Sequence, residues 1–258
     1  MVNKKTKRDT EPPRGVSRKI FDKENWTPKT ELGRKVKSGE IKSIEEIMTS
    51  GRKILESEIV DALLSNLESE FIYAGQSKGK FGGGKRSIWR QTQKKTKEGN
   101  KPKFTALTVV GNRDGYVGVG RGKAKETMPA REKAVRNAKL NIIRIVRGCG
   151  AWEGVPDTNS IPFTVSGKCG SVRIKLMPAP KGVGLCVEKE CKKMLALAGI
   201  KDVYSKTFGQ TKVKINLMEA CFDALRNLSK VKIQPQHIEK LGYVEGPIKY
   251  GKEKDSDN

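Results

Sequence analysis

Residues 104–126 read FTALTVVGNRDGYVGVGRGKAKE, and this run sets the architecture of the first half of the chain. Its opening FTALTVV is rich in β-branched residues and predicts a strand. GNRDG has the composition of a turn, and YVGVG predicts the returning strand. Gly118 and Gly120 share a face of that strand with Tyr116. Because glycine weakens a strand, we expect another backbone to pack closely against this face.

Patterns on both sides of this hairpin predict a helix, three antiparallel strands and a helix. Upstream, Ser43 and Glu46 have capping-box spacing for a short helix, and ESEIVDALLSNLESEF over 56–71 predicts a second helix. A strand over 87–93 and the polar loop KKTKEGNK over 94–101 follow. Downstream, residues 125–147 predict a helix with Pro129 in its first turn. Its apolar face comprises Ala130, Ala134, Val135, Ala138, Ile142 and Ile145.

The second half predicts a smaller unit of strands and helices. We expect two strands over 161–180 with a turn at 167–170. A helix over 187–199, ended by Gly199, should follow. A strand over 201–209 and a helix over 216–228, opened by Asn216, should complete the unit. The chain then divides into a basic N-terminal extension (1–40), a first domain (41–147), a linker (148–160), a second domain (161–235) and a polar, mobile tail (236–258).

The charge of the chain indicates a polyanionic partner. The 258 residues include 53 Lys and Arg against 29 Asp and Glu, which gives a formal charge of +24. Neutralised phosphates release counterions, and this release drives the binding of such a protein to nucleic acid. An anionic membrane fits less well, because we find neither an apolar run long enough to span a bilayer nor a secretory signal.

The cysteines do not indicate a metal site or disulfides. The five cysteines lack CxxC spacing, and the single histidine, His237, lies near the tail. An odd number of cysteines in a long chain without a signal is typical of reduced, mostly buried thiols in the cytoplasm. We therefore expect neither a metal nor another cofactor.

Two glycine-rich basic stretches could meet phosphate. GKFGGGKRS, residues 79–87, is one residue short of a P-loop, but Arg86 stands where the magnesium-binding Ser or Thr belongs, and a helix precedes it instead of a strand. We interpret it as a flexible basic linker able to order itself along RNA. GVGRGKAK, residues 118–125, leads from a strand into a helix. Arg121, Lys123 and Lys125 there predict contact with RNA phosphates, the alternative being a solvated helix start.

The sequence contains no convincing set of catalytic residues. Asp114 belongs to a turn, Glu153 and Asp157 belong to the linker, and no paired carboxylates or nucleophile with an adjacent base emerge. Trp26, Trp89 and Trp152 could stack on bases, but anchoring a loop to the core is the commoner role. The sequence therefore favours binding over catalysis, and we expect no enzyme.

Several motifs in one order resemble the universal small-subunit ribosomal protein S5 family in its archaeal form, which is close to the eukaryotic one. They are FTALTVVGNRDGYVGVGRGKAKE, RGCGAWE, GKCGSVRIKLMPAPKGVGL and LALAGIKDVYSKTFG, and the similarity runs over residues 25–231. The resemblance implies an α+β fold. Its N-terminal α-β-β-β-α domain is of the double-stranded-RNA-binding type, and a small α/β domain with a left-handed βαβ crossover follows.

The resemblance also implies a structural role in the small ribosomal subunit, hence in the cytoplasm. Members of the family bind 16S-type rRNA at the neck between head and body, contact ribosomal protein S4 and other subunit proteins, and border the channel where mRNA enters. They support subunit assembly and translational accuracy, and they are not homo-oligomers. We expect the rRNA-binding residues to be Arg90, Lys94, Lys95, Lys97, Lys101 and Lys103 in and beside the 94–101 loop, Arg113, Arg121, Lys123 and Lys125 at the hairpin turn and helix start, and Lys168 and Arg173 in the second domain.

Two other functions stay open at this point. One is a free-standing regulator that binds double-stranded RNA with the first domain alone. The other is an enzyme, because some small-molecule kinases share the fold of the second domain. The Gly/Ser-rich phosphate loop of such kinases is not recognisable, since Gly182 and Gly184 have no serine nearby.

Overall fold

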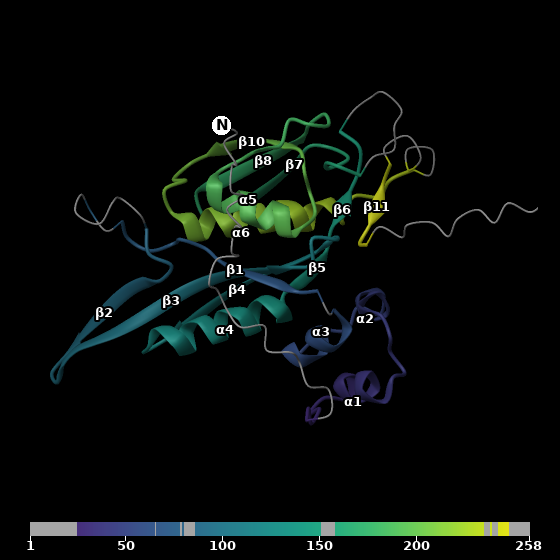
Figure 1. Ribbon diagram of the computed structural model, residues 1–258. Coiled ribbons are helices and arrows are strands. Elements are labelled where there is room, and N and C mark those ends of the chain that lie inside the picture. Colours follow the sequence, from purple (N-terminus) through teal and green to yellow (C-terminus); the bar gives the residue numbers. More distant parts are fainter. Residues whose placement is uncertain are drawn as a thin grey trace, which may run out of the picture.

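The computed structural model describes residues 25–64, 66–77, 79, 86–150, 158–234, 238 and 242–247. Within these residues, helices and sheets alternate in layers (Figure 1). Helix α4 (Thr127–Leu140) covers one face of a first sheet, helices α5 (Lys189–Leu197) and α6 (Lys214–Leu228) lie on the other side of that sheet, and a second sheet lies beyond them. None of the described helices combines the length and the hydrophobicity that crossing a bilayer requires.

The first sheet is antiparallel and centres on one long strand. Its strands are β1 (Glu68–Phe71), β2 (Arg90–Thr96), β3 (Gly99–Gly111), β4 (Tyr116–Ala124) and β5 (Ile142–Arg144). Strand β3 pairs with β4 along one edge, and β1 and β2 share its other edge. The predicted β3–β4 hairpin is confirmed, although both strands extend beyond the predicted residues.

The glycines of β4 bring α4 into backbone contact with the sheet. A Cβ placed on Gly118 or Gly120 would lie 2.2 Å or 2.0 Å from backbone atoms of Ala138. Gly122 has the same relationship to Ala130, at 2.1 Å from its carbonyl oxygen. Small residues on both surfaces therefore let the helix lie directly on the strand. The prediction of a close backbone against this face is confirmed.

The opposite face of the first sheet shares a core with the second half of the chain. Buried side chains of β3 and β4, including Leu107 and Val119, belong to the same hydrophobic cluster as Leu195 of α5. The backbone N–H of Arg113 donates to the carbonyl oxygen of Leu197 at 2.8 Å. The predicted domain boundaries stay predictions, but the two halves bury one continuous core.

The second sheet has the order β7-β8-β10-β9, from β7 (Val165–Cys169), β8 (Val172–Pro178), β9 (Leu185–Cys186) and β10 (Val203–Phe208). Strands β9 and β10 are parallel and are joined through α5, whereas the other pairs are antiparallel. Helix α6 packs against β7 and β8. The helix that Gly199 ends and the strand over 201–209 are confirmed, and so are the two strands over 161–180, although their turn lies at Gly170 and Ser171.

A small helical cluster precedes the sheets. It comprises α1 (Glu31–Ser38), α2 (Ile44–Thr49) and α3 (Ser57–Leu63), with Trp26 buried among their apolar residues. Lys139 on α4 pairs with Asp61 on α3 at 2.6 Å and attaches the cluster to the first sheet. The predicted anchoring role of Trp26 is confirmed. The basic extension over 1–40 thus contains a folded segment from residue 25, and residues 1–24 lie outside the described residues.

Three helix predictions need correction. Residues 68–71 are not helical but form β1, because the free edge of β3 offers them backbone partners. The helical spacing of Leu67 and Phe71 explains the mistaken prediction. Helix α4 ends at Leu140 instead of 147, and Ile142–Arg144 forms β5 against β4. Helix α6 begins at Lys214, so Asn216 lies inside its first turn and is not its cap.

The tail prediction also needs correction. Strand β11 (Val244–Glu245) pairs antiparallel with β6 (Val146–Arg147), so this part of the tail is fixed to the body. The buried Arg147 guanidinium donates hydrogen bonds of 2.7 Å to Gly246 O and to Asp114 Oδ1. One arginine therefore joins the tail to the turn between β3 and β4.

Candidate nucleic-acid interface

The β2–β3 hairpin projects from the body beyond α4 (Figure 1). Its ladder runs without interruption from Arg90 opposite Thr105 to Thr96 opposite Gly99. Gly99 has a φ of 110°, which closes the turn tightly, and Thr96 Oγ1 donates to the Gly99 carbonyl at 2.7 Å. The predicted loop over 94–101 is therefore wrong. The sequence there is polar and shows no alternation of apolar residues, but the long β3 extends the ladder through it.

The register places most of the predicted cations on one face. Antiparallel partners lie on the same face, and faces alternate along each strand. Lys94 is opposite Lys101, and Thr105 is opposite both Arg90 and Lys123. We call the set on this face the hairpin cation face: Arg90, Lys94, Lys101, Lys103, Arg121 and Lys123. All six side chains are exposed.

Lys95 and Lys97 lie apart from this set. Lys95 is opposite Asn100 on the other face of the ribbon, and Lys97 forms the turn with Glu98. Glu98 pairs with Lys101 at 2.6 Å, but both side chains are more than half exposed. Exposed pairs of this kind contribute little, so Lys101 remains available to a phosphate.

A basic hollow of about 550 Å³ lies where β3 and β4 meet the first turn of α4. Lys103, Lys123 and Lys125 line it together with Lys133, and Glu126 is the only acid among its lining residues. Lys123 lines this hollow from β4 and not from the helix, and Arg121 also belongs to β4, which corrects the predicted helix start. Lys133 was not among the predicted binding residues, although its place one turn after Pro129 was an available signal.

The remaining predicted residues lie elsewhere. Arg113 is in the turn at the far end of β3, where its side chain pairs with Glu68 at 2.7 Å and its φ is 59°. Lys168 and Arg173 are opposite each other on the exposed face of the second sheet. Trp89 lies under the guanidinium of Arg131 at 5.0 Å, so it helps to anchor the base of the hairpin.

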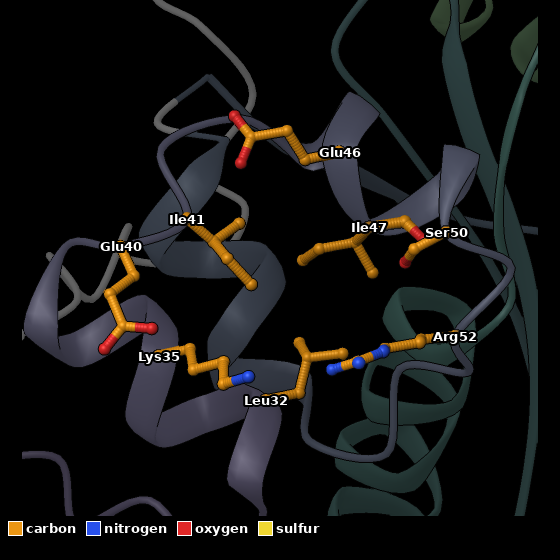
Figure 2. A pocket seen from close by; sticks show the side chains of 8 residues that line it. All are labelled: Leu32, Lys35, Glu40, Ile41, Glu46, Ile47, Ser50 and Arg52. Carbon is orange, nitrogen blue, oxygen red and sulfur yellow. The ribbon is translucent and has the colours of Figure 1, made fainter.

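A second hollow, of about 320 Å³, lies among the N-terminal helices and does not suit a polyanion. Its floor is apolar, and Lys35 and Arg52 point toward one another across it (Figure 2). Glu40, Glu46 and Ser50 also line it. Two cations balanced by two carboxylates give this hollow no net charge.

Two side chains with raised pKa values, Cys169 and Tyr116, do not suit nucleophilic catalysis. Burial, followed by the hydrogen bond to Glu219, raises the pKa of the Cys169 thiol to about 11. Burial also raises the pKa of Tyr116 to about 12. Both groups stay protonated at neutral pH and are poor nucleophiles. Among the described residues, no cluster of His, Cys, Asp and Glu could hold a metal ion.

The burial of the cysteines agrees in part with the prediction, and several residues considered in the sequence lie outside the described residues. Cys149, Cys191 and Cys221 are buried, Cys169 is half-buried and Cys186 is exposed, and none of the five forms a disulfide within the described residues. His237, Trp152, Glu153 and Asp157 lie outside the described residues, as do residues 80–85 of the P-loop-like stretch.

The two halves of the chain match two family models. Residues 88–146 match the N-terminal domain of ribosomal protein S5, and residues 167–239 match its C-terminal domain. The chain is 52% identical over 228 residues to the small ribosomal subunit protein uS5 of Nanoarchaeum equitans, which covers 87% of this chain and 97% of the relative. The chain belongs to the ribosomal protein S5 family.

Further relatives agree with this membership. The uS5 proteins of Methanococcus maripaludis (strain DSM 14266) and Methanocaldococcus jannaschii are 46% and 47% identical. The alignments cover 90% and 88% of this chain and 97% and 99% of those relatives. The predicted resemblance to the S5 family in its archaeal form is confirmed. The family consists of structural ribosomal proteins, so the enzyme alternative is set aside, and nothing supports the free-standing regulator.

Proposed function

We propose that this S5-family protein is a structural constituent of the small ribosomal subunit that holds 16S-type rRNA through the hairpin cation face and the adjoining basic hollow. The observation that carries the proposal is the register of β2, β3 and β4. It gathers six exposed cations on one face, although they come from three separate stretches of sequence.

The chemistry of this surface suits phosphate more than bases. Lysine ammonium groups act as point charges and dominate the set, with Arg90 and Arg121 as the two guanidinium groups. Such contacts fix a protein on a folded RNA without reading its sequence. A projecting two-stranded ribbon can follow the backbone of an RNA helix while the rest of the molecule stays outside it.

Family membership supports the finer parts of the proposal. We place the protein in the cytoplasmic ribosome at the neck between head and body, beside ribosomal protein S4 and the channel where mRNA enters. There it supports assembly and translational accuracy. A first domain of the double-stranded-RNA-binding type and a left-handed crossover between β9 and β10 belong to the same proposal.

Charge reversal in the hairpin tests the role. Replacing Lys94, Lys95 and Lys97 by Glu should reduce incorporation into small subunits and change decoding accuracy, measured by sedimentation and by a misreading reporter. The matched control reverses Lys42, Lys53 and Lys192, which are exposed but lie outside the hairpin. Unchanged assembly and accuracy in the hairpin variant would show that the hairpin does not hold rRNA.

Sedimentation also separates the proposal from a free regulator. A subunit constituent should stay with small subunits at high salt, because many contacts are buried together, whereas a regulator should be released. The experiment compares the native protein in cell extracts at low and high salt.

A further inference from the structure

The second sheet has an outer face that points away from α5 and α6 (Figure 1). Burial alternates along its strands, so that Val165, Ile174 and Val203 are buried while their neighbours are exposed or half-buried. The outward positions of the described strands are Ser166, Lys168, Arg173, Lys175, Met177, Cys186, Tyr204, Lys206 and Phe208. None of these side chains is acidic.

Two aromatic side chains stand exposed on this face. Tyr204 is 39% exposed and Phe208 is 49% exposed, both on β10. Large aromatics are usually placed to bury their area, so their exposure on an open sheet indicates a missing contact surface. Four residues of a strand separate them by about 13 Å.

Cations surround the aromatics, and within the described residues none of them pairs with a carboxylate. Lys168 is opposite Arg173, and Lys175 is opposite Lys206. Like charges directly opposite each other destabilise a sheet. Lys206 Nζ also lies 5.7 Å from the centre of the Phe208 ring. The fold therefore keeps like charges opposite each other, next to exposed rings. An anionic ligand with flat groups would neutralise the charges and could stack on the rings.

We propose that this outer face is a platform on which single-stranded RNA stacks its bases. Tyr204 and Phe208 would each stack one base, and Lys168, Arg173, Lys175 and Lys206 would neutralise the phosphates between and beside them. The inference rests on the proposed function, because RNA is the ligand in both. It differs in kind from the hairpin, which carries cations and projects no aromatic ring on its cation face.

A single-stranded RNA fits these observations better than a protein. Lysine is depleted in protein interfaces, whereas here it supplies three of the outward positions. Exposed rings interleaved with cations are the usual composition of single-strand binding surfaces.

Binding of two RNAs by the full-length protein tests the inference. The probes are a fluorescein-labelled oligouridylate of roughly ten nucleotides and a labelled RNA hairpin with a fully paired stem, both followed by fluorescence anisotropy. The variants Tyr204→Leu and Phe208→Leu keep apolar bulk but remove the ring. Each should weaken oligouridylate binding about tenfold, while binding of the paired stem stays unchanged. Tyr204→Phe should retain wild-type affinity.

Tyr73→Leu is the matched control, because Tyr73 is 42% exposed but lies outside the second sheet. It should bind both probes as the wild type does. Equal urea midpoints for all variants would show that the sheet remains folded, as expected for outward positions.

The outcomes separate this inference from the proposed function. A wild-type protein that binds the paired stem but not oligouridylate overturns the platform and leaves the hairpin proposal standing. Binding of neither probe overturns both. Leucine variants that bind oligouridylate normally, or that lose only a neighbouring protein from assembled subunits, would show that the rings serve another contact.

Discussion

The backbone nitrogen of Ala138 lies 2.0 Å from the point where a Cβ of Gly120 would stand. The backbones of β4 and α4 are thus in direct contact, and displacing either one would cost free energy. This contact fixes the position of α4 on the sheet, and with it the basic hollow at the start of the helix.

Replacing Gly120 by Ala should therefore destabilise the protein by about 3 kcal/mol or more, because the added methyl group overpacks a contact between two backbones. Urea denaturation at fixed salt measures the effect. The control is Gly182→Ala, where φ is 91° and, apart from the chain neighbours, no atom of the described residues lies within 4 Å of the new Cβ. That change should cost only about 1 kcal/mol of backbone strain. Equal midpoints for the two variants would refute the tight packing.

The Asp114–Arg147 pair should respond asymmetrically to mutation. The Arg147 side chain is 3% exposed and the Asp114 side chain is 42% exposed. Asp114→Asn leaves a buried guanidinium without its counter-charge and should cost about 3 kcal/mol. Arg147→Met leaves no charge buried: the Asp114 carboxylate can be reached by water, and only the neutral Gly246 carbonyl loses its donor, so the change should cost less. Thermal and urea unfolding of both variants check the order, and the reverse order would contradict it.

The Cys169 thiol should react slowly at alkaline pH. Its pKa is raised to about 11 by burial and then by Glu219, so it is mostly protonated at pH 9. Iodoacetamide at this pH should modify exposed Cys186 first, as peptide mass spectrometry can follow. Glu219→Gln should speed the reaction of Cys169, since it removes the carboxylate that opposes the thiolate. If this variant reacts no faster, Glu219 does not control the thiol.

The raised pKa of Cys169 also makes the unfolding free energy depend on pH. An unfolded cysteine loses its proton near its ordinary pKa of 9.0, whereas folded Cys169 keeps its proton until about pH 11. The stabilisation is therefore complete below pH 9 and is lost as the pH rises to 11. In Cys169→Ser, the fall in unfolding free energy across this window should be smaller. If the unfolding free energy falls equally in Cys169→Ser and in the wild type, groups other than Cys169 cause the fall.

Local patterns in the sequence were enough for much of the fold. Gly118 and Gly120 on one face of a strand predicted the close approach of α4, because only a neighbouring backbone explains glycine there. The helix over 187–199 was also predicted from local spacing, and Cys191, Met194 and Leu195 form the buried face of α5. Such features depend on a few adjacent residues, and the sequence shows them directly.

The errors arose where a distant partner decides the structure. Phe71 fits helical spacing, but Thr108 of β3 offers it a ladder position 37 residues away. The grouping of Lys94 with Lys123 could not be predicted either, because it depends on the register of two separate ladders. A shift of one residue in either ladder would have placed the cations on opposite faces.

This register makes a prediction about single residues. Lys94→Ala should weaken binding of rRNA fragments more than Lys95→Ala does, because Lys95 lies on the other face of the ribbon. Both lysines are exposed neighbours, so their folding effects should match. Filter binding of both variants at one salt concentration makes the comparison, and equal affinities would mean that the face is irrelevant.

The salt dependence of rRNA binding tests the central claim most directly. Replacing Lys94, Lys101 and Lys123 by Ala should reduce the slope of log affinity against log salt by about 3, one phosphate contact for each lysine. The matched triple variant, with Ala at Lys42, Lys53 and Lys192, should keep the wild-type slope. A slope that is the same in the wild type and in both variants would contradict the hairpin cation face as the site of phosphate contact.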